Sequence, residues 1–437
     1  MGVSRREALK GLLAGGAVTW RQGASVVSAE ARAVSLRLDN GLRARIIAND
    51  SRYIAAALVL RSSDIRAADG LAHILEHTSF VGAAGAFSAN LIKQMHQDYI
   101  QESNASTEPG MMQWQVSFLP KYLEQVLGLL AVISLDQQCD VETVRREARV
   151  VLQELYLDRY HHSFRHKRLL GGALFGSDHP YGIDTTDSEI AKARTRPDRL
   201  ASELRAYAQT IRLPANMDLF VVGGLDTGVA ATIVERCFGG LPFARGPMLS
   251  VPHAPVTQTH RAFTASSSEL RRPLSKIKIA WNTGIGVTHT DAKVVLALSE
   301  YLNAMLFRRL RERHGDAYAP VASYDPDECS GVFEIDIPST QAPHRIEYKV
   351  FEGIADLKAN IEVGELTRFR DRLELKRRQT AESNEAMLER MVQMLVEGSS
   401  IHDFDLDAVT RDAVLDAARR YLPSYKGAYV RLSLIGR

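Results

Sequence analysis

The chain contains 437 residues, of which 45% are hydrophobic and 24% are charged, and its 54 basic and 52 acidic side chains give a formal net charge of +2. This length and composition are typical of a globular protein with two or three domains, and they exclude collagen-like, disordered and coiled-coil chains. The excess positive charge lies in the first 31 residues, so the remainder offers no electrostatic support for sequence-independent binding to nucleic acid.

The N-terminal segment has the organisation of an export signal. The pair Arg5-Arg6 precedes a short apolar run from Gly11 to Trp20, and Ala29 to Ala31 form a small-x-small cleavage site. This order is typical of a secretory signal peptide, and the run is too short to span a hydrocarbon core of about 30 Å. The paired arginines indicate the twin-arginine type, with an ordinary secretory signal as the alternative. We therefore expect residues 1–31 to be a signal peptide, no stable membrane insertion, and a periplasmic or otherwise exported mature protein.

The first half of the mature chain begins with a predicted meander of strands. Segments 34–38, 42–47 and 54–60 are apolar, and Asn40-Gly41 between the first two is the strongest short signal for a hairpin turn. Further periodic segments predict a strand at 217–223 and helices at 70–80, 88–98, 120–135, 142–160, 198–210 and 227–238.

A linker is expected next, because residues 243–260 are rich in proline and glycine and lack periodicity. Beyond it the order recurs. Strands are expected at 275–281, 317–325, 331–338 and 428–435, and helices at 289–313, 344–360, 364–396 and 407–421. The sequence therefore predicts two α+β domains, residues 32–242 and 261–437, of ordinary domain size.

The strongest chemical signal is the motif His73-Ile74-Leu75-Glu76-His77. On a helix, residues four apart share a face, so His73 and His77 can offer two imidazoles to one metal ion. Glu76 stays close to that face, where it could take a proton from a metal-bound water. The alternative is two helical histidines beside a surface glutamate.

A second acidic helix supplies candidates for a third ligand. In the predicted helix 142–160, Glu147 and Glu154 are seven residues apart, so they fall within about 20° of each other at the edge of the apolar stripe. Carboxylates at this margin can point into a cleft, although on their own they are more typical of a solvated face.

The spacing of these residues resembles a known family. His73-x-x-Glu76-His77 followed by Glu154 is similar to the inverted zinc motif of the pitrilysin and mitochondrial-processing-peptidase metallopeptidases. Other stretches resemble recurrent segments of the same family: Leu38–Leu42, Asp69–Ala72, Asn104–Thr107, His179–Gly182, Pro214–Met217, Phe238–Pro242 and Leu310–Tyr318.

The resemblance implies a fold and a metal site. The fold is half of the family's clamshell, an α+β arrangement of two similar domains in which each mostly antiparallel sheet is packed with helices. One Zn²⁺ per chain would be held by His73, His77 and Glu154. Glu76 would act as general base, and Glu147 would steer the site electrostatically.

The resemblance also implies residues that contact the substrate. Arg311 and Tyr318 would donate hydrogen bonds to substrate carbonyls or to the developing oxyanion. Without the resemblance, they read as an exposed arginine and a core tyrosine. Asn104 and Ala105 would present their backbone to a peptide bound as an added strand.

The function expected from these residues is that of a zinc endopeptidase acting on peptides or unfolded segments. The alternative is a non-catalytic subunit of a heterodimeric complex, because the family contains such members. A dimer is expected, since the chain offers two of the four similar domains of a full family clamshell. A homodimer is the symmetric solution, and a heterodimer with a related subunit is the alternative.

Overall fold

The computed structural model describes residues 24–30, 32–63, 65, 70–108, 110–160, 162–248, 253–327, 330–361, 363–397 and 409–437. The arginine pair and the apolar run of the predicted export signal lie outside the described residues. The last part of that predicted signal forms strand β1 (Ala24–Glu30), which pairs with β2 (Ala33–Leu38).

Contacts divide the chain into two compact units. Unit 1 comprises Met1–Tyr156, Thr185–Ser250 and Glu382–Met391, and unit 2 comprises Leu157–Asp184, Val251–Ala381 and Val392–Arg437. The expected domains, 32–242 and 261–437, differ from these units by two exchanged segments. Residues 157–184 belong to unit 2, because Leu170 and Leu174 pack on that unit's sheet. Residues 382–391 belong to unit 1, because Asn384 donates hydrogen bonds to Ser51 and Tyr53.

Unit 1 is built on a seven-stranded sheet in the order β1-β2-β3-β7-β4-β6-β5. The pair β3·β7 is parallel, and all other pairs are antiparallel. The interior strand β4 is buried almost throughout, whereas β2 alternates between buried leucines and exposed Arg37. The remaining strands are β3 (Arg43–Ala48), β4 (Ile54–Arg61), β5 (Ile100–Glu108), β6 (Met111–Phe118) and β7 (Met217–Gly223).

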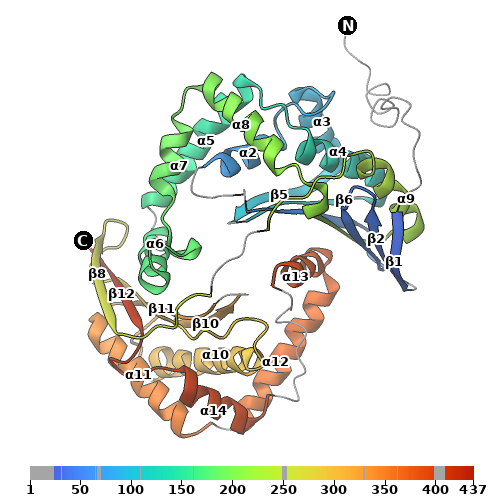
Figure 1. Ribbon diagram of the computed structural model, residues 1–437. Coiled ribbons are helices and arrows are strands. Elements are labelled where there is room, and N and C mark those ends of the chain that lie inside the picture. Colours follow the sequence, from blue (N-terminus) through green and yellow to red (C-terminus); the bar gives the residue numbers. More distant parts are fainter. Residues whose placement is uncertain are drawn as a thin grey trace. The chain divides into compact units, whose positions relative to one another are not determined.

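Helices α4 and α9 cover one face of this sheet, and α2 contacts its edge strand β5 (Figure 1). Their apolar faces and the sheet form one continuous core. The helices of this unit are α2 (Leu71–Thr78), α3 (Ala89–Tyr99), η2 (Pro120–Tyr122), α4 (Leu123–Leu135), α5 (Val141–Tyr160, whose last residues fall in unit 2), α7 (Thr186–Ala193), α8 (Pro197–Ile211), η4 (Pro214–Asn216) and α9 (Thr227–Phe238).

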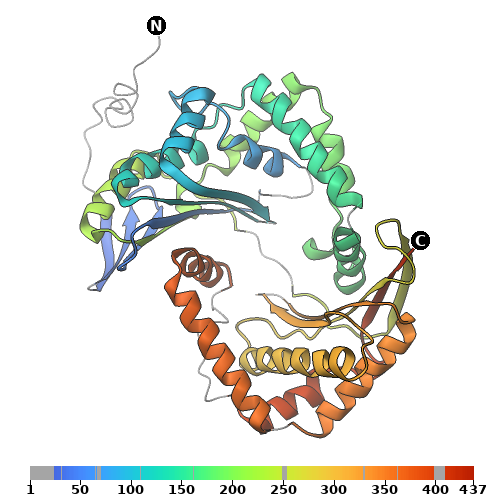
Figure 2. The same ribbon diagram turned by 180° about the vertical axis from the view of Figure 1, so that it is seen from behind.

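Unit 2 is built on a five-stranded sheet in the order β10-β11-β9-β12-β8. Helices α10, α11 and α14 cover one face and α6 packs on the other (Figures 1 and 2). The strands are β8 (Arg261–Ser267), β9 (Ser275–Asn282), β10 (Val321–Pro326), β11 (Gly331–Ser339) and β12 (Val430–Gly436). The helices are α6 (His162–Phe175), η3 (Pro180–Gly182), α10 (Ala292–Leu306), the π-helix η5 (Phe307–Arg313), α11 (Pro343–Ala359), α12 (Val363–Glu382), α13 (Asn384–Glu397, which begins in unit 1) and α14 (Arg411–Tyr421).

The two units repeat one topology. Five strands of unit 1 lie in the order β3-β7-β4-β6-β5, and the strands of unit 2 lie in the order β8-β12-β9-β11-β10. Adding five to each strand number of unit 1 gives the order of unit 2, so the strands follow the same path in both sheets. The single parallel pair also recurs, as β3·β7 and as β8·β12. The prediction of an α+β fold with two similar, mostly antiparallel domains is therefore confirmed.

One predicted helix is wrong. Residues 364–396 form two helices, α12 and α13, rather than one. The break occurs at Ser383, whose hydroxyl accepts a hydrogen bond from the backbone N–H of Ala386 and thereby caps α13. A serine cap competes with a continuous helix because it satisfies a donor that would otherwise lack a partner.

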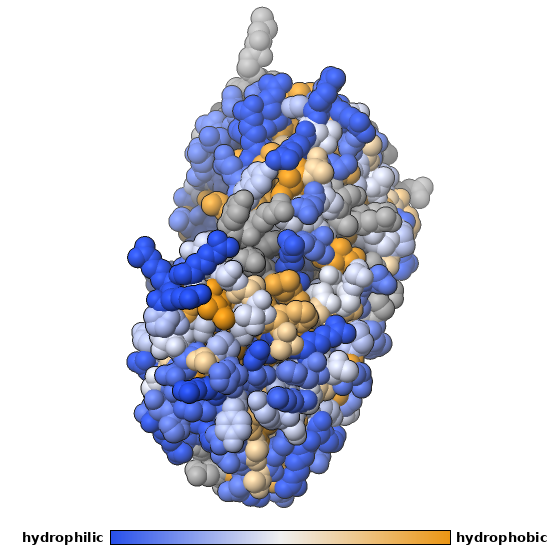
Figure 3. Space-filling view, turned by 90° about the vertical axis from the view of Figure 1, so that its left-hand side faces the viewer, coloured by the Kyte–Doolittle hydropathy of each residue, from blue (hydrophilic) through white to orange (hydrophobic). Residues whose placement is uncertain are grey.

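The face of the molecule shown in Figure 3 is mainly polar. Hydrophilic side chains cover most of it, and hydrophobic ones form small groups among them. Exposed apolar residues in such small groups are ordinary for a folded protein. None of the described helices combines the length and apolar character needed to cross a membrane.

Candidate metal centre

The residues of the predicted metal motif share one face of α2. This helix begins after Gly70, whose φ of 69° lies in the left-handed region that glycine adopts without strain. A Cβ atom at position 70 would lie 3.0 Å from the Cα of Glu189, so only glycine allows this close approach to α7. His73, Glu76 and His77 are partly exposed, because the helix buries its other face through Ala72, Ile74, Leu75 and Thr78.

The structure brings His73, His77 and Glu154 together. The Nε2 atoms of His73 and His77 lie 3.7 Å and 3.2 Å from Oε2 of Glu154, which α5 supplies. One potential ligand atom from each residue lies within 4.8 Å of the other two. The two histidine side chains are about four-fifths buried, whereas the Glu154 side chain is 46% exposed. The cluster is therefore held by the core and open on the side of Glu154.

Two further carboxylates face the opposite ring nitrogens. Oε2 of Glu189 lies 3.0 Å from Nδ1 of His73, and Oε2 of Glu147 lies 4.0 Å from Nδ1 of His77. The other oxygen of Glu189 accepts a hydrogen bond from Thr185, and the other oxygen of Glu147 accepts one from Arg146. The hydrogen bond between His73 and Glu189 orients the His73 ring with its Nε2 atom toward Glu154. The more distant Glu147 faces the Nδ1 side of His77.

Glu189 was missed by the sequence reasoning. It lies 112 residues beyond His77 and reaches the site only because α7 packs beside α2. The structure, and not the sequence, marks this residue, because the side chain of Glu189 is only 11% exposed although it lies in a short helix. A buried carboxylate needs a partner.

The charges of this cluster are strongly coupled. Burial opposes the charged form of His73, but hydrogen bonds with Glu154 and Glu189 outweigh this effect and raise the pKa of His73 to about 10. Hydrogen bonds from His73 and His77 hold the pKa of Glu154 far below its ordinary value. Without a metal ion, the cluster therefore retains a proton on His73 and a negative charge on Glu154. A bound cation would have to displace that proton.

Buried hydrogen bonds anchor the C-terminal end of α2. Ser79 follows the helix directly, and its hydroxyl accepts hydrogen bonds from Trp114 Nε1 at 3.0 Å and Gln137 Nε2 at 2.5 Å. All three side chains are buried. This network ties the helix that carries the histidines to β6.

The predicted substrate-binding residues lie on an edge strand. Asn104 and Ala105 pair with Gln115 and Trp114 of β6, and β5 has no neighbour on its other side among the described strands. The backbone groups on that side of β5 are therefore placed to pair with an extended peptide.

Arg311 and Tyr318 lie in unit 2, where the structure brings them together. The guanidinium carbon of Arg311 sits 4.6 Å from the centre of the Tyr318 ring, a cation–π contact. Tyr318 is 73% exposed, so it is not a core tyrosine. Arg311 belongs to the π-helix η5, a conformation that is rare in proteins and frequent at functional sites.

Two family models match the chain. The model described as "Insulinase (Peptidase family M16)" matches residues 62–173, and the one described as "Peptidase M16 inactive domain" matches residues 200–373. The first range contains every candidate metal ligand and Glu76. The second contains Arg311 and Tyr318.

Solved structures with the same fold include several proteases. A protease from Helicobacter pylori gives a TM-score of 0.76 at 16% identity, over 92% of this chain and 98% of that chain. The periplasmic protease PqqL from Escherichia coli gives 0.75 at 15% identity, over 94% of this chain and 48% of PqqL. The ferredoxin protease FusC in complex with Arabidopsis ferredoxin gives 0.68 at 16% identity, over 92% of this chain and 47% of FusC. These TM-scores establish a shared fold. No curated protein sequence matches the chain.

Proposed function

Because the chain belongs to peptidase family M16, we propose that it is a zinc-dependent endopeptidase that hydrolyses peptides or unfolded segments of proteins. The observation that carries this proposal is the convergence of two histidine Nε2 atoms and one carboxylate, with both Nδ1 atoms facing buried carboxylates.

The donor set fits zinc in number, kind and spacing. Catalytic zinc sites use three protein ligands, such as two histidines and a glutamate, and leave a fourth position for water. Bonds of about 2.0–2.2 Å in a tetrahedral site place neighbouring ligand atoms about 3.4 Å apart. The two separations from Oε2 of Glu154, 3.7 Å and 3.2 Å, bracket this value, and all three ligand atoms lie within 4.8 Å of one another. A zinc ion held by His73, His77 and Glu154 would lower the pKa of a bound water and polarise a peptide carbonyl.

The proton chemistry is assigned to Glu76. It lies on the same face of α2 as both histidines and is partly exposed, so it can accept a proton from the attacking water and pass it to the leaving amine. Glu189 and Glu147 act through the histidines. Glu189, 3.0 Å from Nδ1 of His73, sets the tautomer and orientation of that ring. Glu147, 4.0 Å from Nδ1 of His77, acts on its ring through its charge.

Substrate binding is assigned to residues of both units. A peptide pairing with β5 beside Asn104 and Ala105 would run along the strand that α2 contacts. Arg311 and Tyr318 are hydrogen-bond donors suited to substrate carbonyls or to the oxyanion that forms during hydrolysis. We further propose that the protein is exported and works as a dimer. PqqL, which shares the fold, is described as periplasmic, and a homodimer is the simplest symmetric assembly.

The alternative function, a non-catalytic subunit, has one observation in its favour: part of the chain matches a model described as an inactive domain. That match covers residues 200–373. The candidate metal ligands and Glu76 all lie inside the other match, residues 62–173, so the description does not argue against catalysis at the metal centre.

Metal analysis combined with cleavage of quenched fluorescent peptides tests the proposal. The purified protein should contain one zinc ion per chain. The Glu76→Gln variant should keep that zinc but lose activity by about 10²–10⁴-fold, because it lacks the general base. Glu142→Gln is the matched control, since that side chain is 77% exposed on α5. Undiminished hydrolysis by Glu76→Gln would remove Glu76 from the mechanism. A zinc-loaded protein that cleaves no peptide would favour the non-catalytic subunit.

A further inference from the structure

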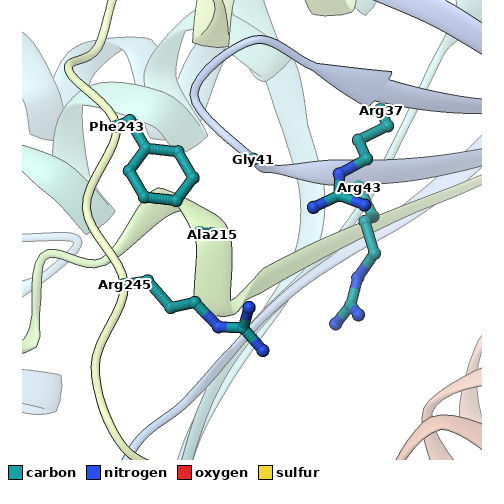
Figure 4. A pocket seen from close by; sticks show the side chains of 6 residues that line it. All are labelled: Arg37, Gly41, Arg43, Ala215, Phe243 and Arg245. Atoms are coloured by element: carbon teal, nitrogen blue, oxygen red, sulfur yellow. The ribbon is translucent and has the colours of Figure 1, made fainter.

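A pocket lined by three arginines lies in unit 1, at the hairpin between β2 and β3 (Figure 4). Arg37 lies on β2, and Arg43 is its cross-strand partner at the start of β3. Arg245 enters from the irregular segment that follows α9. The cavity volume is about 180 Å³, and the remaining lining residues are Gly41, Ala215 and Phe243.

The positive charge of this pocket is only partly neutralised. Nε and Nη2 of Arg43 donate hydrogen bonds to the two oxygens of Asp218, at 2.7 Å and 2.6 Å. This single carboxylate supplies at most one negative charge, and it also lies 4.0 Å from Nη2 of Arg61. Arg37 and Arg245 are exposed, and neither forms an ion pair with a carboxylate in the described part of the chain. Two positive charges are thus left without a counter-charge.

The walls of the pocket are fixed by buried hydrogen bonds. The backbone N–H of Ala215 donates to the carbonyl of Ala244 at 2.9 Å, and the Asn216 side chain donates to the carbonyl of Gly246 at 3.1 Å. Asn40 ties the hairpin to the end of α9 by donating to the carbonyl of Phe238 at 2.6 Å. Both asparagines are almost fully buried. The segment that carries Arg245 is therefore held against the hairpin before any ligand binds.

Gly41 keeps the pocket open. Its φ of 89° disfavours any other residue, and a Cβ atom there would lie 2.6 Å from the Cβ of Ala215 and 3.1 Å from the Phe243 ring. The hairpin turn therefore needs glycine for both its conformation and its packing, and the space in front of it stays free for a ligand.

We propose that this pocket binds a dianion of phosphate size, either inorganic phosphate or the phosphoryl group of a monoester. Two uncompensated guanidinium groups match the two charges of such an anion, and the planar guanidinium fork suits its oxygens. The volume is below the 300–1,000 Å³ typical of sites for drug-sized ligands, so the pocket holds a single small group. Phe243, 62% exposed, offers an apolar surface to the organic part of a monoester.

The pocket is separate from the metal centre. β3 and β5 are four steps apart in the sheet, and neighbouring strands are about 4.8 Å apart, so about 19 Å separates the pocket's strand from the strand that α2 contacts. The proposal therefore does not rest on the peptidase activity.

Isothermal titration of the full-length protein with inorganic phosphate at physiological ionic strength tests this inference. One phosphate should bind per chain at the pocket. Arg37→Ala and Arg245→Ala should each weaken that binding by about tenfold or more, because each removes hydrogen bonds to a charged ligand. Arg52→Ala removes the same charge from an exposed position of unit 1 outside the pocket, and screening should limit its effect to about twofold.

Further arms of the titration identify the ligand. Tighter binding of phenyl phosphate than of inorganic phosphate would identify a monoester, whereas equal or weaker binding would identify the free ion. Three results would overturn the proposal: no saturable binding of phosphate, binding of acetate as tight as that of phosphate, or equal losses in the Arg52→Ala and pocket variants. Thermal unfolding of each variant verifies that these exposed substitutions leave the fold intact.

Discussion

Replacing Glu189 by glutamine tests whether the outer carboxylates hold the histidines for the metal. The Glu189 side chain is 11% exposed, and its two oxygens engage Nδ1 of His73 at 3.0 Å and the hydroxyl of Thr185. Glutamine keeps the shape but has no charge and only one acceptor oxygen, so it cannot serve both partners in the same way. Loss of such an outer contact costs about 10–100-fold in metal affinity.

The structure also predicts an order among the outer carboxylates. Oε2 of Glu147 lies 4.0 Å from Nδ1 of His77, beyond hydrogen-bond distance, and Arg146 already compensates the other oxygen at 2.8 Å. We therefore expect Glu147→Gln to weaken zinc binding by less than about tenfold. Glu142→Gln, on the exposed face of α5, should leave it unchanged.

Competition with a chromophoric chelator measures these affinities, and zinc content after dialysis provides a second reading. Equal zinc affinity in the wild type and Glu189→Gln would refute the assignment of Glu189 as a positioning residue. A larger effect for Glu147→Gln than for Glu189→Gln would refute the reasoning from distance, even if both variants lose metal.

Two further predictions concern stability. Ser79→Ala should lower the free energy of unfolding by about 1–3 kcal/mol, because it removes the shared acceptor of two buried donors, Trp114 and Gln137; a loss below about 0.5 kcal/mol in urea denaturation would contradict this. Burial alone would raise the pKa of Glu385, but hydrogen bonds from Ser117 and Tyr53 outweigh it and hold that pKa below its ordinary value of 4.5. The hydrogen bonds to ionised Glu385 therefore stabilise the fold fully above the unfolded-state pKa, and this stabilisation is lost as the pH falls through the lowered folded-state pKa. The difference in the free energy of unfolding between the wild type and Glu385→Gln should therefore shrink from pH 7 toward about pH 3. A difference that does not vary with pH would count against this assignment.

Local patterns predicted most elements of this fold. Asn40-Gly41 indicated the hairpin between β2 and β3, and period-3.6 patterns indicated helices such as α2, α5 and α9. The family resemblance read from short motifs is confirmed by the two family models. The motif 73–77 and the spacing to Glu154 predicted three residues that the structure brings together.

Features that depend on tertiary packing escaped the sequence. Glu189 reaches His73 through the packing of α7 against α2, and no spacing rule links the two. Arg245 reaches the pocket because Asn216 and Ala215 bind the segment around it, and that segment reads only as an irregular linker. The exchange of α6 into unit 2 likewise follows from contacts between its leucines and strands β9 and β12, which lie more than 100 residues later in the chain.

The repeated topology gives the helix of the candidate metal cluster an equivalent in unit 2, although among the described residues the cluster itself is found only in unit 1. β4 and β9 are the middle strands of the five that the two units share, and the helices that follow them in the chain are α2 in unit 1 and α10 in unit 2. These positions are equivalent, but α10 spans Ala292–Leu306 and contains no histidine. A metal bound as proposed in unit 1 therefore has no counterpart on α10. What unit 2 offers instead is the exposed Arg311–Tyr318 contact, which lies between α10 and β10 in the chain. Because α2 and α10 occupy equivalent places, the two units differ in side chains rather than in fold, and the proposed division of labour needs no difference in topology.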